Sequence, residues 1–156
     1  MRLGLIALAV LALVIIGSSD AFESTRQLGD LSERSRPMLT PAGATLSVVS
    51  FALSTAIYIA LGVALARSLS TERGALLTGL ATGLAAGLVG GTIRAVAASD
   101  YVGRSVSRFG LGMEFLVAVL VVFVLLSIAA SAAGGAALTW LGFRGARPRP
   151  TPRPPS

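Results

Sequence analysis

The chain has 156 residues, of which 54% are hydrophobic and 13% are charged, and its formal net charge is +6. A mean hydropathy of +0.81 excludes a water-soluble domain of ordinary composition. All 13 basic residues are arginine, and lysine, histidine, cysteine and asparagine are absent. The chain therefore lacks thiol nucleophiles, disulfides, the common metal ligands and the usual bases that activate a serine. We expect neither an enzyme nor a cofactor or metal site.

Four apolar runs predict membrane-spanning helices. Such a helix needs about 20 apolar residues, because about 30 Å of hydrocarbon is crossed at 1.5 Å per residue. Trp140 and Phe143 precede Arg144 at the end of the last run, as interfacial aromatic anchors do. We expect an all-α integral membrane four-helix bundle, with one transmembrane domain over residues 1–143. The predicted spans are residues 3–17, 44–66, 75–93 and 115–143.

The first run has two interpretations. Arg2 precedes it and the small residues Gly17, Ser18 and Ser19 follow it, which is also typical of a cleaved signal peptide. Cleavage would leave three helices with the same loops on the same sides of the membrane. We favour a retained helix, and the sequence leaves both interpretations open.

The arginines weakly orient the chain. With the N-terminus inside, seven arginines are cytoplasmic and six are outside, which favours a cytoplasmic C-terminus. We expect a multi-pass protein of the bacterial plasma (inner) membrane.

The tail, residues 144–156, is rich in arginine and proline. Alternate prolines disfavour helix and sheet, so we expect this tail to be disordered. Its four arginines attract anionic lipid at the cytoplasmic surface. The arginines of the chain lack the interleaved aromatic residues of a nucleic-acid platform, so we expect no nucleic acid as a partner.

Two connections on the outer side carry polar residues. In residues 18–43 we expect a short helix capped by Asp20 and ended by Pro37 and Pro41. Residues 94–114 are expected on the membrane surface, with the boundary residue Arg94 extending its charged end toward water.

A glycine ridge is the most informative pattern in the third run. Small residues recur at every fourth position from Ala75 to Ala95. In water each interior glycine costs a helix roughly 1 kcal/mol relative to alanine. In lipid such a ridge lets a second helix approach closely, at a crossing angle of about −40°. The glycines of the ridge are Gly79, Gly83, Gly87 and Gly91.

Small residues on two other runs predict which helices meet the ridge. We expect serines of the second run to meet Gly87 and Gly91, and small residues of the last run to meet Gly79 and Gly83. The ridge helix is then the centre of the bundle, residues 116–126 face lipid, and the Tyr58 hydroxyl makes an interhelical hydrogen bond. The candidate packing residues are Gly79, Gly83, Gly87, Gly91, Ser50, Ser54, Ser131 and Gly135.

Three roles for the ridge stay open: closing the monomer, joining copies into a homo-oligomer or binding another membrane protein, and lining a path for a solute. The first hypothesis for function is a non-catalytic assembly or interaction subunit in the lipid bilayer, packed through the glycine ridge. The alternative is a passive channel or transporter component lined by small residues.

Overall fold

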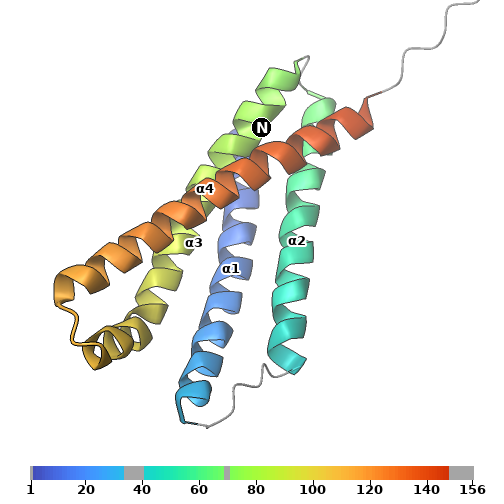
Figure 1. Cartoon of the computed structure of the whole chain (residues 1–156). Coiled ribbons are helices and arrows are strands. Elements are labelled where there is room, and N and C mark those ends of the chain that lie inside the picture. Colours follow the sequence, from blue (N-terminus) through green and yellow to red (C-terminus); the bar gives the residue numbers. More distant parts are fainter. Residues whose placement is uncertain (1, 34–40, 69–70, 148–156) are drawn as a thin grey trace, which may run out of the picture.

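The structure is a computed structural model that describes residues 2–33, 41–68 and 71–147, and this part of the chain is helical apart from its turns. Its four helices are each long and apolar enough to cross a membrane (Figure 1). The expected fold class is confirmed: the protein is an all-α membrane protein with four helices. The helices are α1 (Arg2–Glu33), α2 (Pro41–Ala66), α3 (Glu72–Arg108) and α4 (Met113–Ala146).

Helices α1 and α2 both extend beyond their apolar runs. Helix α1 continues to Glu33, so Asp20 lies inside it and the prediction of a separate helix capped by Asp20 is wrong. Polar residues continue a helix readily once its apolar part has formed, because elongation adds one hydrogen bond for each residue fixed. Pro41 begins α2, where its missing N–H costs nothing in the first turn. Pro37 lies outside the described residues.

Helix α3 also extends farther than expected and has defined ends. It covers Arg94 to Arg108, so the segment predicted to lie on the surface is mostly a continuation of the ridge helix. At its start the Thr71 hydroxyl oxygen accepts a hydrogen bond of 3.4 Å from the Gly74 N–H, as an N-cap does.

A Schellman motif ends α3. The Gly110 N–H donates to the Ser107 carbonyl and the Leu111 N–H to the Val106 carbonyl, both at 3.1 Å. Gly110 has φ of 66°, a left-handed conformation that glycine adopts without a steric penalty. The motif returns the chain to the membrane as α4, which begins three residues later at Met113.

The four helices form a ring in which α4 lies between α2 and α3. The most extensive contact joins α3 to α4, followed by the contact of α2 with α4, while α1 packs on α3 and α2. Helix α2 has little contact with α3. Helix α3 contacts all three other helices and has the most buried span of the four, in agreement with the predicted central place of the ridge helix, but α2 is attached mainly through α4. The physical reason is that α4 carries glycines that admit both neighbours, Gly135 beside α3 and Gly142 beside α2.

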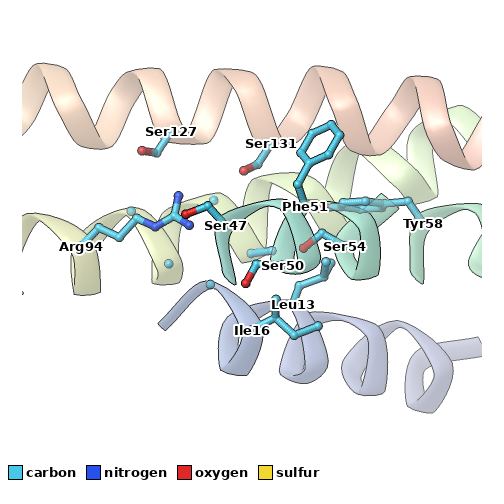
Figure 2. A pocket seen from close by; sticks show the side chains of 15 residues that line it. Leu13, Ile16, Ser47, Ser50, Phe51, Ser54, Tyr58, Arg94, Ser127 and Ser131 are labelled. Atoms are coloured by element: carbon cyan, nitrogen blue, oxygen red, sulfur yellow. The ribbon is translucent and has the colours of Figure 1, made fainter. Parts of the chain in front are cut away.

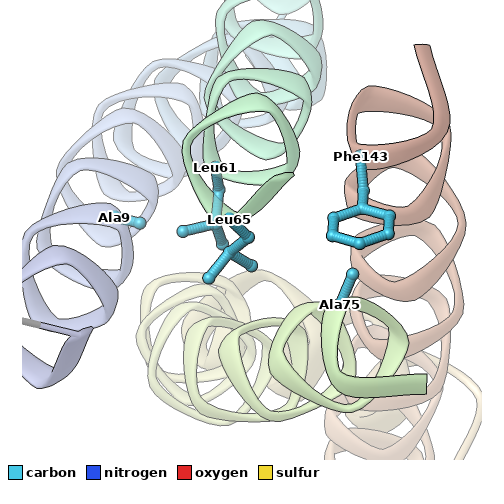
Figure 3. Close-up of a cluster of buried hydrophobic side chains, with 5 residues drawn as sticks. All are labelled: Ala9, Leu61, Leu65, Ala75 and Phe143. Atoms are coloured by element: carbon cyan, nitrogen blue, oxygen red, sulfur yellow. The ribbon is translucent and has the colours of Figure 1, made fainter. Parts of the chain in front are cut away.

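A cluster of apolar side chains closes one end of the ring (Figure 3). Phe143 of α4 and Ala75 of α3 are fully buried there, against Leu61 and Leu65 of α2 and Ala9 of α1. All four helices therefore contribute to this core.

A hydrogen bond joins α4 to α3 at the same end of the ring. The Trp140 Nε1 donates a hydrogen bond of 3.1 Å to the Glu72 carboxylate, and the Arg144 guanidinium lies 5.2 Å from the Trp140 ring centroid. Helix α4 continues to Ala146, three residues beyond the predicted span. The rest of the predicted tail, residues 148–156, lies outside the described residues.

The first half of α4 is exposed. Residues 116–126, all of which the structure describes, include no buried side chain. Leu125 and Leu126 are about three-fifths exposed, at 59% and 64%. Such a surface suits contact with acyl chains.

Candidate functional site

The glycine ridge of α3 packs against α4 along its whole length. A Cβ atom built on Gly79 would overlap the Gly135 carbonyl oxygen, and one on Gly83 would overlap the Ser131 carbonyl oxygen. At Gly87 the Cβ would lie 2.9 Å from the Ile128 Cα, and at Gly91 it would lie 3.0 Å from the Ser127 Cβ. The two backbones are therefore close enough that alanine does not fit at Gly79 or Gly83.

Helix α2 does not supply the contact predicted for its serines. The nearest atoms beside Gly87 and Gly91 all belong to α4, and Ser50 and Ser54 instead line a cavity. The prediction for these serines is wrong because α4, not α2, covers Gly87 and Gly91, and α2 and α4 diverge along this part of the bundle (Figure 1).

A second glycine seam joins α2 to α4. A Cβ on Gly62 would overlap the Thr139 carbonyl oxygen, and one on Gly142 would overlap the Ile59 carbonyl oxygen. Gly142 was missed as a packing residue, although it stands seven residues after Gly135 and so lies on nearly the same face of α4. This spacing was the available signal.

A cavity of about 360 Å³ lined by several serines lies where α2 and α4 diverge. Ser47, Ser50 and Ser54 of α2 line it, and Ser127 and Ser131 project into it from α4 (Figure 2). Apart from Arg94, helix α3 contributes only small residues to the wall, and α1 contributes mainly apolar groups. These residues are Ala86, Gly87, Gly90 and Gly91 of α3, and Leu13, Ile16 and Gly17 of α1.

Four of the serine hydroxyls in the cavity make no hydrogen bond within the described part of the chain. They belong to Ser50, Ser54, Ser127 and Ser131. Other hydroxyls in the membrane-spanning helices are satisfied locally: Thr82 donates to the Thr78 carbonyl at 2.9 Å, and Thr92 to the Leu88 carbonyl at 2.7 Å. The cavity thus holds hydrogen-bonding capacity that the fold itself does not use.

Tyr58 lines the end of the cavity near Gly135, where α2 and α4 are in contact. It is 6% exposed, and a Cβ on Gly135 would lie 2.9 Å from the edge of its ring. No interhelical hydrogen bond of its hydroxyl is present among the described residues, so that prediction is wrong. The tyrosine lines the cavity instead.

Arg94 is the one charged side chain among the described residues that line the cavity. It is partly buried, and Figure 2 shows its guanidinium directed toward Ser47. It follows Glu72 by 22 residues, about 33 Å of helix, and so lies near the opposite membrane interface. Sequence reasoning treated Arg94 as a boundary charge and missed this placement. The available signal was its position three residues after Gly91, on the ridge side of α3.

Thr139 carries a buried hydroxyl that has no hydrogen-bond partner within the described residues. It lies where α2, α3 and α4 meet, because its atoms face both Gly62 and Gly79. Replacing Thr139 by valine keeps the shape and removes the unpaired group. We expect T139V to raise the free energy of unfolding by about 1 kcal/mol.

Thr82 supplies the matched control for Thr139. Both side chains are fully buried, at 0% exposure, but the Thr82 hydroxyl is satisfied by the Thr78 carbonyl. We expect T82V to leave stability unchanged or to lower it slightly. Reversible unfolding in mixed detergent micelles measures both variants, and a T139V protein less stable than T82V would contradict this account.

The described residues contain no group of three or more His, Cys, Asp or Glu side chains arranged to hold a metal ion. Comparison of the chain with protein-family models, curated proteins and solved structures found no match.

Proposed function

We propose that the protein is a non-catalytic assembly subunit of the bacterial plasma membrane, which binds a membrane helix of a partner through the outer face of α4. Close helix contacts in lipid need small residues on both helices. The ridge of α3 is already covered by α4, so a partner needs another surface of this kind.

The outer face of α4 carries this proposal. Ala129, Ala133 and Ala137 are spaced four residues apart and are all exposed. Beside them, a Cβ on Gly134 would meet no atom within 4 Å. The second half of α4 therefore carries small residues on the side away from the bundle as well as on the side toward it.

Substitution of Ala133 by leucine tests the proposal. A leucine there holds a partner helix away, and we expect the amount of co-purified partner to fall by about tenfold or more, which corresponds to about 1.4 kcal/mol of lost contact. The partner is captured from native membranes in mild detergent, and a second copy of this chain is distinguished from another protein by mass spectrometry.

Ala81 provides the matched control because it is an exposed alanine on α3 flanked by exposed leucines such as Leu80 and Leu84. We expect A81L to leave co-purification unchanged. Equal capture by the wild type and A133L would overturn the proposal.

The cavity favours a second candidate function, a passive channel or transporter component. Small residues from all four helices line it, as expected of a path for a small solute. Reconstituted protein would then raise solute or ion flux above the background of empty vesicles, and G90L, which places a side chain in the cavity, would lower that flux. Flux at background would exclude this candidate.

The proposal includes the orientation of the chain in the membrane, with the C-terminus on the cytoplasmic side. A cytoplasmic C-terminus places Trp140 and Arg144 at the inner interface and Arg94 at the outer one. Labelling of single cysteines introduced at Gly145 and Met113 tests this with an impermeant reagent, since the native chain has no cysteine.

A further inference from the structure

We infer that the cavity between α2 and α4 binds a phosphate group, with Arg94 as the cationic partner and the serine hydroxyls as hydrogen-bond donors. This inference is independent of the proposed assembly surface, which lies on the other side of α4.

Arg94 supplies the charge. Its guanidinium lines the cavity and is directed toward Ser47, and the described lining includes no carboxylate. A guanidinium has five N–H donors in a planar fork, so it binds an anion in addition to any group of the protein that it contacts. Charge-assisted bonds of this kind are the strong ones in a site shielded from water.

The hydroxyls favour phosphate over carboxylate. Ser50 and Ser54 approach from α2, and Ser127 and Ser131 from α4, so donors stand on two facing walls. A carboxylate has two oxygens, and one bidentate arginine already engages both of them. A phosphate has additional oxygens, which can accept bonds from hydroxyls on both walls at once.

An aromatic hydroxyl group that the described part of the chain leaves without a hydrogen bond also lies at this site. Tyr58 is 6% exposed, yet its hydroxyl has no hydrogen bond among the described residues and lines the cavity. This hydroxyl is not among the fully buried unpartnered atoms of the described residues, so it remains accessible from the cavity and can bond to a ligand there. A bound ligand that reaches this end of the cavity supplies the hydrogen-bond partner of the Tyr58 hydroxyl.

The shape of the site admits a ligand from the membrane. A volume of about 360 Å³ is that of a small-molecule site. Ser47 and Tyr58 are 11 residues apart on α2, about 16 Å of helix, so the cavity extends over about half of the hydrocarbon thickness. Phe51, which is 75% exposed, marks its open rim. The phosphate can belong to a lipid head group or to a soluble phosphate ester.

The test uses the full chain in lipid nanodiscs. Discs of phosphatidylcholine containing phosphatidic acid are compared with discs containing oleate, and retained ligand is counted by native mass spectrometry. We expect the wild type to retain phosphatidic acid in preference to oleate, and R94Q to lower this retention by about tenfold. R104Q is the matched control, because Arg104 is an exposed arginine farther along α3, outside the cavity lining; its retention should equal that of the wild type.

A second arm distinguishes the source of the phosphate. Glycerol phosphate is added to discs of phosphatidylcholine alone. Binding that Arg94 requires in this arm identifies a soluble phosphate ester, and its absence together with retained phosphatidic acid identifies a lipid head group.

The serine variant S127A/S131A guards against a folding defect in R94Q, because alanine keeps the Cβ atoms that face α3. We expect it to retain several-fold less phosphatidic acid. Retention by R94Q and by S127A/S131A equal to that of the wild type would overturn the inference, as would a preference for oleate.

Discussion

Replacing Gly135 by alanine is expected to lower the free energy of unfolding by about 3 kcal/mol, which is the cost of overpacking at a close contact. A Cβ at this position would lie 2.6 Å from the Gly79 carbonyl oxygen and 3.2 Å from the Gly83 Cα. Backbone atoms cannot move aside as a flexible side chain does, so α3 and α4 must separate. Separation also removes dispersion contacts along the whole seam, which are the main attraction between helices in lipid.

Gly134 makes this prediction specific. It is the neighbour of Gly135 on the same helix, but a Cβ there meets no atom within 4 Å. We expect G134A to leave stability within about 0.5 kcal/mol of the wild type, as surface substitutions usually do. Steric trapping or unfolding in mixed micelles measures both variants.

The same comparison holds on α3, where G83A should destabilise the protein and G90A should not, because a Cβ on Gly90 also meets no atom within 4 Å. Equal stabilities within either pair would contradict the tight seam between α3 and α4.

The packing of the ridge was accessible from the sequence because a close helix contact depends on local chemistry. Glycines four residues apart leave the backbone bare along one side of a helix, and the spacing of Ser127, Ser131, Gly135 and Thr139 offers a matching side. The sequence did not in the same way predict that α2 packs on α4. Helix α4 presents bare backbone toward two neighbours, and the spacing of Gly135 and Gly142 does not by itself say which helix each glycine meets.

The cavity was beyond prediction for a different reason. It exists because α2 and α4 diverge from their contact near Tyr58 and Gly135 while the facing residues stay small. Divergence depends on the crossing geometry of whole helices, which composition and spacing do not specify. Arg94 illustrates the consequence. A charge at the end of an apolar run normally extends into water, but here α2 and α4 diverge beside Arg94, so its side chain lines the cavity instead.

Substitution of Gly142 by alanine is expected to detach α2 from α4, with a loss of about 3 kcal/mol of stability. The added Cβ would overlap the Ile59 carbonyl oxygen and lie 3.0 Å from the Ile59 Cα. Gly145 is the control on the same helix, because a Cβ there meets no atom within 4 Å. Spin labels on cysteines at Ala60 of α2 and Leu141 of α4, both exposed, report the separation of the two helices.

The outcome of G142A shows whether α2 is held in the bundle mainly by α4 or by α3. Helix α2 has little contact with α3, so once its seam with α4 opens only α1 holds it in place. We therefore expect a longer and broader distribution of distances between the labels in G142A, with G145A unchanged. If α3 held α2 directly instead, α2 would stay in place against it, and G142A would leave the label distances as they are in the wild type.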